Sequence, residues 1–183
     1  MAEVVIDDEN ARRHRRRQLI EWGIVILAAF IAAAVLRATV VQAFSIPSVS
    51  MEETLLVGDR VLVNKQNRDA NVGDIVVFHR PPGQEAATIK DLIKRVVAVE
   101  GDRVEARDGQ LMVNGEFVDE PYLASGTRTE MDRAYDLKRG EVFVMGDNRG
   151  QSADSRVFGP IKKSSIIGHA YFRVWPIGRF GGI

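Results

Sequence analysis

The chain of 183 residues contains no cysteine. This absence excludes disulfides, thiolate zinc sites and the peptidases that use a cysteine nucleophile. Histidine is scarce, because only His14, His79 and His169 are present. An excess of charge is also missing, since 25 lysine and arginine residues balance 25 aspartate and glutamate residues. Because a general nucleic-acid binder normally carries a basic excess, no nucleic-acid partner is expected.

One long apolar run is present, near the N-terminus. Residues 19–36 are apolar apart from Glu21, and a cluster of arginines precedes them. A helix over residues 19–41 would be about 33 Å long, which is enough to cross a hydrocarbon core of about 30 Å. Arginine-rich flanks stay in the cytoplasm. We therefore predict a cytoplasmic tail over 1–18, a transmembrane signal-anchor helix over 19–41 and an extracytoplasmic domain over 42–183.

The apolar run has two other interpretations, a buried helix of a soluble protein and a cleaved secretory signal peptide. Cleavage is disfavoured because Gln42-Ala43-Phe44 offers no small–x–small pattern at the expected end. The sequence thus favours an uncleaved single-pass anchor in the plasma (inner) membrane, in contact with membrane lipid.

After residue 44 the pattern changes from helical to short β-branched runs separated by turn signals. The expected strands cover residues 60–64, 74–78, 92–99, 103–106, 110–113, 141–145 and 166–174. Asp108-Gly109 and Asn114-Gly115 suit tight hairpin turns. We therefore predict a mainly β fold, with an antiparallel β-rich domain after the N-terminal helix. Residues 103–140 are expected to form a small β cap or insertion.

The first candidate site segment reads Ile46-Pro47-Ser48-Val49-Ser50-Met51. Pro47 fixes its own φ and favours an extended Ile46, so this segment cannot be a regular helix. One of the two hydroxyls can attack a carbonyl while the other donates a hydrogen bond nearby. Taken alone, the pattern is equally typical of an ordinary turn.

The second candidate is Lys94, in the expected strand 92–99. Strand alternation places it between Leu92 and Val96 on one face, while Ile93 and Arg95 lie on the other face. A lysine in apolar surroundings can lose its proton near neutral pH and act as a base. The alternative is a lysine at a strand edge whose amine reaches water.

The third candidate is the dense polar segment over residues 146–159. Asp154 and Arg156 can pair there and order a sharp loop that presents Ser152. A calcium loop is a weaker interpretation, because the ligand spacing of an EF-hand is missing and two arginines lie inside the segment. No metal and no cofactor are expected.

The three segments together resemble, in order and spacing, the conserved boxes of the type I signal peptidases, a family of Ser-Lys serine proteases. The box I-P-S-x-S-M-x-P-T-L matches residues 46–55 except that Glu53 replaces proline. The box that begins K-R-V and ends G-D matches residues 94–102, with Ala98 and Glu100 as departures. The box G-D-N-R-x-x-S-x-D-S-R-x-x-G matches residues 146–159 at every fixed position.

The resemblance implies a role for each matching residue. It implies that Ser50 is the nucleophile and that Lys94, uncharged, is the base. Ser48 is implied to donate to the oxyanion together with the Ser50 backbone N–H. By the same resemblance, Ser152 orients the lysine amine. Asp154 and Arg156 are implied to form a structural ion pair beside the site.

The resemblance also implies the substrate class. The family cleaves exported preproteins after a small–x–small pattern, which predicts a signal peptidase acting together with the protein-export machinery. The substrate is implied to bind as an added strand along Ile46-Pro47 and Leu92-Ile93.

Three alternatives differ in testable ways. A Ser-His-Asp hydrolase needs His79 or His169 beside Ser50. The self-cleaving SOS repressors share a Ser-Lys pair but need an N-terminal DNA-binding domain. A membrane-tethered β domain that only binds partners predicts no loss of function in Ser50→Ala.

Overall fold

A computed structural model describes residues 2–82 and 89–183, without the side chains of 2–12 and 36–39. The chain divides into two compact units, Met1–Val40 and Val41–Ile183. The first unit is helical and the second is built from antiparallel strands. The prediction of a mainly antiparallel β chain with one N-terminal apolar helix is confirmed.

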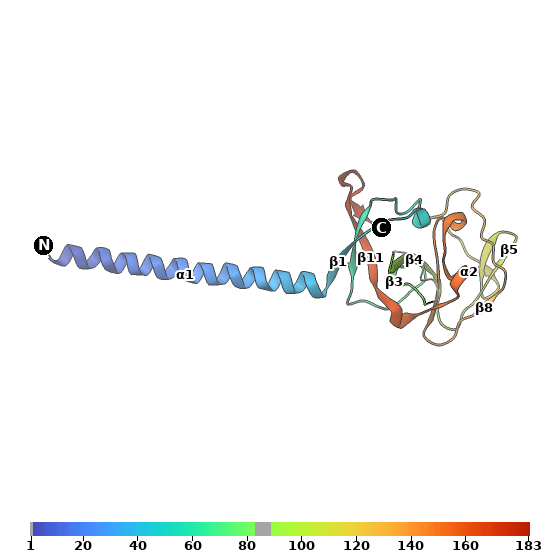
Figure 1. The fold of residues 1–183 in the computed structure, drawn as a ribbon, viewed down its shortest axis with the longest axis horizontal. Coiled ribbons are helices and arrows are strands. Elements are labelled where there is room, and N and C mark those ends of the chain that lie inside the picture. Colours follow the sequence, from blue (N-terminus) through green and yellow to red (C-terminus); the bar gives the residue numbers. More distant parts are fainter. Residues whose placement is uncertain (1, 83–88) are drawn as a thin grey trace. The chain divides into compact units, whose positions relative to one another are not determined.

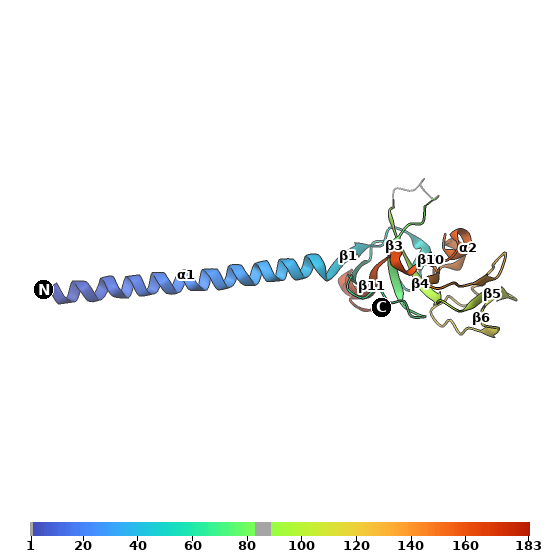
Figure 2. The ribbon, with the colours of Figure 1, turned by 90° about the horizontal axis from the view of Figure 1, so that it is seen from below.

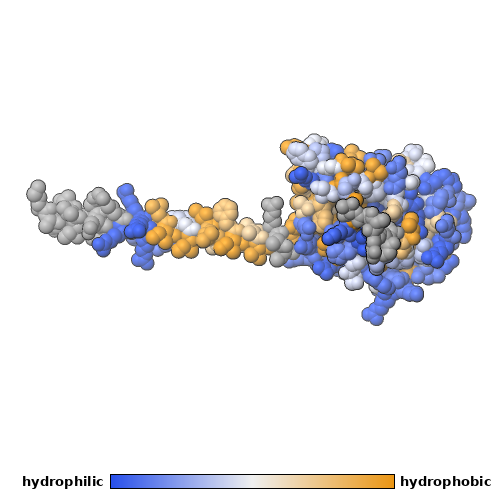
Figure 3. Space-filling model, in the orientation of Figure 1, coloured by the Kyte–Doolittle hydropathy of each residue, from blue (hydrophilic) through white to orange (hydrophobic). Residues whose placement is uncertain are grey.

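The first unit is the single helix α1 (Ala2–Thr39), drawn as one continuous coil in Figure 1. Its segment Arg13–Val35 is long and apolar enough to cross a membrane, judged by length and composition. Figure 3 shows a hydrophobic band along this helix, next to a hydrophilic cluster. Leu19, Trp22 and Phe30 are 72%, 66% and 72% exposed. A helix that is apolar all round fits the interior of a bilayer.

The main sheet of the second unit has eight strands. Seven follow one another in space, and the eighth, β12, pairs with β11. All recorded pairs are antiparallel. In spatial order the strands are β1 (Val41–Ser45), β2 (Arg60–Asn64), β11 (Ile166–Trp175), β3 (Ile75–His79), β4 (Asp91–Ala98), β9 (Glu141–Met145) and β10 (Ile161–Lys162), with β12 at Gly181–Gly182.

A second sheet of four strands is inserted between β4 and β9. Its spatial order is β7 (Glu116–Phe117), β6 (Gln110–Val113), β5 (Arg103–Arg107) and β8 (Tyr135–Asp136). Asp108 and Asn114 have φ of 55°, and the glycine after each has φ of 82° and 86°. Positive φ at both turn positions is what a tight hairpin requires. Figure 2 shows β5 and β6 at the end of the β unit away from β1.

Short helices occupy the connections between strands. They are η1 (Val49–Met51), η2 (Arg149–Gln151), α2 (Ser155–Phe158), η3 (Lys163–Ser165) and η4 (Ile177–Arg179). Two of them matter for the site. The connection from β1 to β2 contains η1, and the connection from β9 to β10 contains η2 and α2.

Apolar side chains pack on both faces of the main sheet. One core cluster holds Val77 together with Ile46, Met51 and Leu55, while Val76 belongs to the cluster on the other face. Neighbouring residues of a strand point to opposite faces, so β3 contributes to both clusters. A third cluster joins Val97 and Phe143 of the main sheet to Leu111 of the small sheet. The segment around Ser50 is thus held by the first core cluster, and the small sheet by the third.

Candidate active site

Ser50 lies in η1, in a segment that is fixed at both ends. The Ile46 N–H donates to the Asp59 carbonyl at 2.9 Å, and the Leu55 N–H donates to the Met51 carbonyl at 2.7 Å. Ile46, Met51 and Leu55 are buried, and Ser50 itself is 6% exposed. Burial of the flanking apolar residues therefore fixes the backbone that carries the Ser50 hydroxyl.

Lys94 lies on β4 opposite Val76 of β3 and is 2% exposed. Its Nζ donates to Ser50 Oγ at 2.6 Å and to the Ile93 carbonyl at 2.8 Å. Among the described residues, no carboxylate lies within ion-pair distance of this amine. Two residues 44 positions apart thus meet in a buried contact between a hydroxyl and an amine.

Burial lowers the pKa of Lys94 from its ordinary value of 10.5 to about 8. Asp154 and Asp147 raise this pKa, and Arg80, in the segment after β3, lowers it. Burial dominates because removing an ammonium from water disfavours its charged form. With a pKa near 8, about a tenth of the amine is neutral at pH 7, so Lys94 is able to accept a proton.

Ser48 lies beside the candidate nucleophile, with its Oγ 3.3 Å from Ser50 Oγ. Its backbone is extended, with φ of −139° and ψ of 160°. Because Ser48 is exposed, its hydroxyl is free to turn toward a bound substrate.

The connection over residues 146–159, called the site loop below, is organised by Asp154. This carboxylate is fully buried and accepts from Nε and a terminal nitrogen of Arg156, both at 2.9 Å. It also accepts the backbone N–H groups of Gly146 at 3.0 Å and Arg156 at 3.2 Å. A buried carboxylate that is paired and fully hydrogen-bonded fixes the backbone around it.

The site loop packs directly on the nucleophile segment. The Asn148 N–H donates to the Ser50 carbonyl at 3.2 Å. Ser152 Oγ is buried without a hydrogen-bond partner among the described residues, and the recorded bonds of the Lys94 amine go to Ser50 and Ile93. A Cβ on Gly146 would lie 2.2 Å from Ser152 Oγ and 2.4 Å from the Ser50 carbonyl oxygen. The contact between the two segments therefore depends on a residue without a side chain.

A groove of about 340 Å³ lies between residues 44–47 and residues 89–93. Within the described parts of the chain, β1 pairs only with β2, and the ladder between β4 and β9 begins at Arg95. Residues 91–94 therefore pair only with β3. Two open strand edges beside a groove can accept an extended peptide. The predicted substrate contacts lie here: Ile46 is buried, Pro47 is exposed, and Leu92 and Ile93 are half-buried.

Neither described imidazole of this unit contacts Ser50. His79 Nδ1 lies 2.9 Å from Asp91, and His169 contacts the Asp69 carbonyl and lies 3.5 Å from Asp74. A Ser-His-Asp arrangement therefore has no geometric support. In the described part of the chain, no group of three or more histidine, aspartate or glutamate residues could hold a metal ion.

Arg95 and Asp147 form a second buried ion pair, which the sequence did not identify. Arg95 Nε and a terminal nitrogen lie 2.9 and 2.7 Å from the two Asp147 oxygens. This guanidinium also donates to the Thr54 hydroxyl and the Gly73 carbonyl. Strand alternation placed Arg95 on the face opposite Lys94, but no local pattern pointed to a partner 52 residues away.

Glu53 has φ of 79°, a left-handed conformation that proline cannot adopt. We expect Glu53→Gly to raise the free energy of unfolding by about 1 kcal/mol, because glycine removes the strain on Cβ. Glu52 has an ordinary φ of −57°, so Glu52→Gly should lower stability slightly. Thermal unfolding in detergent measures both variants. If both variants changed the melting temperature in the same direction, the backbone at Glu53 would not be strained.

The comparisons with known proteins agree in one family description. A family model described as signal peptidase, peptidase S26, matches residues 19–175. The chain is 35% identical to signal peptidase IB of Staphylococcus aureus over 90% of this chain and 94% of that protein. It is 41% identical to the probable thylakoidal processing peptidase 2, chloroplastic, of Arabidopsis thaliana, over 85% of this chain and 45% of that protein.

The chain spans about half the length of the Arabidopsis relatives that it matches. Among solved structures, a signal peptidase I from Enterococcus faecalis matches with a TM-score of 0.47 and 28% identity. The match covers 55% of this chain and 96% of that chain.

Proposed function

Because the chain belongs to the signal peptidase family, peptidase S26, we propose that it is a membrane-anchored serine endopeptidase that removes signal peptides from exported preproteins. The observation that carries this proposal is the buried contact of 2.6 Å between Lys94 Nζ and Ser50 Oγ. A lysine with a lowered pKa can activate a serine without histidine.

The proposed reaction follows from this pair. Neutral Lys94 takes the proton of Ser50 as Oγ attacks the scissile carbonyl, and the ammonium then protonates the leaving amine as the C–N bond breaks. In the second half, Lys94 takes a proton from water as the hydroxide attacks the acyl-enzyme, and the ammonium returns that proton to Ser50 Oγ as the ester bond breaks. Ser48 Oγ and the Ser50 N–H are the proposed donors to the oxyanion, each contributing about 3 kcal/mol by analogy with measured holes.

The groove beside Ser50 supports the proposed choice of substrate. An extended signal-peptide end can pair with the open edge of residues 91–94, with alternate side chains pointing toward the enzyme. The residues one and three positions before the cut then face the same surface. Ile46 and Ile93 are part of the groove lining, and we propose that these side chains leave room only for small residues at both positions.

The proposed orientation places residues 1–18 in the cytoplasm and residues 44–183 outside it, in the plasma (inner) membrane. The arginine cluster before the apolar segment supports this orientation. Anchoring both partners in one membrane raises their effective concentration, and substrates would arrive from the protein-export machinery. We expect external protease to digest the β unit in spheroplasts. Full protection of that unit without detergent would contradict the orientation.

The proposed function is tested by incubating the detergent-solubilised protein with a preprotein and mapping the cut by mass spectrometry. We expect one cut after a small–x–small pattern, with Ser50→Ala losing at least about 10⁴-fold in kcat/KM. A bulky aromatic one or three positions before the cut should abolish cleavage, while the same change two positions before it should be tolerated. Equal cleavage of the substrates with an aromatic residue one, two or three positions before the cut would contradict the proposed specificity. Cleavage by Ser50→Ala would contradict the proposal that the protein is a serine peptidase.

A further inference from the structure

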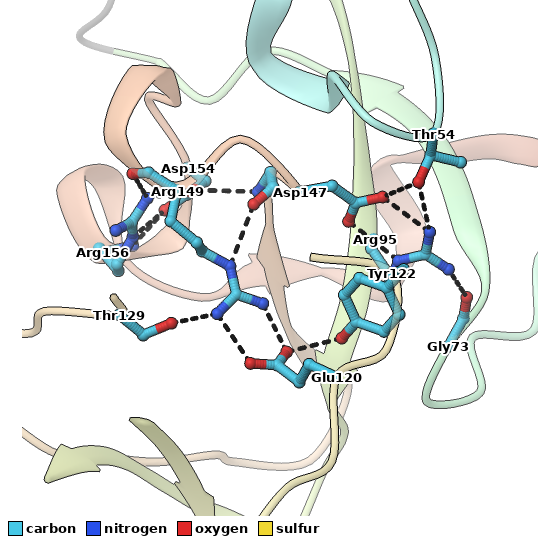
Figure 4. Close-up of polar contacts among 11 residues, drawn as sticks. Thr54, Gly73, Arg95, Glu120, Tyr122, Thr129, Asp147, Arg149, Asp154 and Arg156 are labelled. Carbon is cyan, nitrogen blue, oxygen red and sulfur yellow. Dashed lines mark hydrogen bonds and ion pairs between the residues drawn. The ribbon is translucent and has the colours of Figure 1, made fainter. Parts of the chain in front are cut away.

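A buried polar network joins the loop between β7 and β8 to the site loop, as Figure 4 shows. The network starts from Glu120 and Tyr122, which lie two residues apart just after β7. Each reaches a different arginine: Glu120 contacts Arg149 of the site loop, and the Tyr122 ring contacts Arg95 of β4. Neither Glu120 nor Tyr122 takes part in the proposed chemistry.

The Glu120–Arg149 pair is almost fully enclosed, with side chains 6% and 1% exposed. One terminal nitrogen of Arg149 donates to Glu120 Oε2 at 2.9 Å and the other to Oε1, so the contact is bidentate. Arg149 also donates to the Thr129 hydroxyl and, from Nε, to the Gly146 carbonyl at 3.1 Å. Removing Glu120 would leave a buried guanidinium without its counter-ion, which strongly destabilises the packed conformation of the site loop.

Tyr122 links this pair to the second buried arginine. Its hydroxyl donates to Glu120 Oε1 at 2.6 Å, and its ring centre lies 3.9 Å from the guanidinium carbon of Arg95. Burial, and then the Glu120 carboxylate, raises the pKa of Tyr122, so the hydroxyl keeps the proton that it donates. Arg95 in turn binds both carboxylate oxygens of Asp147, which lies two residues before Arg149 in the site loop.

The two arginines therefore hold the part of the site loop that touches Ser50. Asn148, between Asp147 and Arg149, donates to the Ser50 carbonyl at 3.2 Å. The Arg149 carbonyl accepts from Arg156 at 2.7 Å, and Arg156 grips Asp154. A continuous series of contacts therefore runs from Glu120 through Arg149 and Arg156 to Asp154. The Asp154 carboxylate is one of the two that raise the pKa of Lys94.

We propose that Glu120 and Tyr122 are positioning residues, which clamp the site loop so that Asp147 and Asp154 stay paired with their arginines and water stays away from the Lys94 amine. The role of this clamp in catalysis rests on the proposed function. The clamp itself can be tested without substrate, through the titration midpoint of Lys94.

The charged groups near Lys94 determine in which direction its pKa should change when the clamp is lost. Asp154 and Asp147 raise its pKa, while burial and Arg80 lower it. Opening the clamp weakens the pairing of both carboxylates and admits water, and both changes favour the ammonium. Loss of the clamp should therefore raise the pKa of Lys94 and move the acid limb of the pH–rate profile to higher pH.

The test compares Glu120→Gln, Tyr122→Phe and Glu130→Gln in the full chain in detergent. Glu130 lies in the same loop but forms only an exposed pair with Arg128, so its replacement is the matched control. Lysine labelled with ¹³C at Cε gives one titrating NMR signal for each of the six lysines, and Lys94→Met identifies the signal of Lys94. The same variants are assayed for preprotein cleavage across pH.

We expect the Lys94 titration midpoint to rise by about half a pH unit or more in Glu120→Gln, with a smaller rise in Tyr122→Phe and none in Glu130→Gln. The kcat of Glu120→Gln at pH 7 should fall about threefold or more, because a rise of half a pH unit lowers the neutral fraction of Lys94 about threefold. KM should change little, because the substrate groove is untouched.

An unmoved Lys94 midpoint in folded Glu120→Gln overturns the inference, whatever happens to activity. If that variant does not fold, Tyr122→Phe carries the same test, since it keeps the ring on Arg95 and loses only the hydroxyl. If the wild-type protein cleaves no preprotein, the proposed function fails, while the NMR midpoints still decide whether the clamp exists.

Discussion

Lys94→Met is expected to abolish preprotein cleavage and, at the same pH, to raise the melting temperature of the protein. Methionine fills a similar volume but has no basic group, so Ser50 loses the acceptor of its proton. A loss of at least about 10⁴-fold in kcat/KM is expected, as for other serine nucleophiles without their base. Lys94→Arg should be equally inactive, because a guanidinium does not deprotonate in proteins.

The gain in stability follows from the lowered pKa of Lys94. The folded-state pKa of about 8 lies below the ordinary value of 10.5, so the unfolded chain holds the proton more tightly. The resulting penalty on folding is fully present below pH 8 and fades as the pH rises toward 10.5. The difference between the two values corresponds to about 3 kcal/mol. Lys94→Met removes this penalty and so stabilises the fold. Part of that gain is offset because the Ile93 carbonyl loses its donor.

Thermal unfolding of wild type and Lys94→Met between pH 6 and pH 10 measures the effect. The difference in stability should be largest below about pH 8 and should shrink above it. Lys90→Met, at an exposed position four residues earlier, is the matched control and should show no such dependence. A difference that does not change with pH would mean that the Lys94 pKa is not lowered by burial. Cleavage by Lys94→Arg would remove the Ser-Lys mechanism.

Elements with a strong local pattern could be predicted from the sequence. All seven expected strands are present, because β-branched alternation between turn residues specifies a strand without reference to its partner. The strands β7, β8, β10 and β12 have two residues each and exist only through their pairing, so no local signal marks them. The strand β1 begins at Val41, two residues after α1 ends at Thr39, whereas the apolar run predicts a helix that continues to residue 41.

The candidate site shows the same division between local and long-range information. The resemblance selected Ser50 and Lys94, but nothing near either residue specifies a contact across 44 positions. Glu120 and Tyr122 lie in a stretch that reads as a polar, irregular insertion, and their partners are 29 and 27 residues away in the sequence. Charges in such a stretch normally face water. Only the packed structure shows that Glu120 is enclosed with Arg149.

Gly146→Ala is expected to inactivate the protein although it adds a single methyl group. The added Cβ would lie 2.2 Å from Ser152 Oγ and 2.4 Å from the Ser50 carbonyl oxygen, far inside van der Waals contact. The Ser152 side chain can rotate, but the Ser50 carbonyl belongs to the backbone, so the site loop and the nucleophile segment must separate. The Asn148 N–H would then move away from the Ser50 carbonyl.

Separation of these segments displaces Ser50 Oγ from Lys94, and a displacement of about 1 Å costs about 100-fold in rate. We therefore expect kcat of Gly146→Ala to fall about 100-fold or more, with a moderate loss of stability. Gly150→Ala is the matched control in the same loop, because nothing lies within 4 Å of its added Cβ. Its kcat should stay near that of wild type. Equal activity of the two alanine variants would show that the site loop does not need its close approach to Ser50, and that the hydroxyl–amine pair is held by β4 and η1 alone.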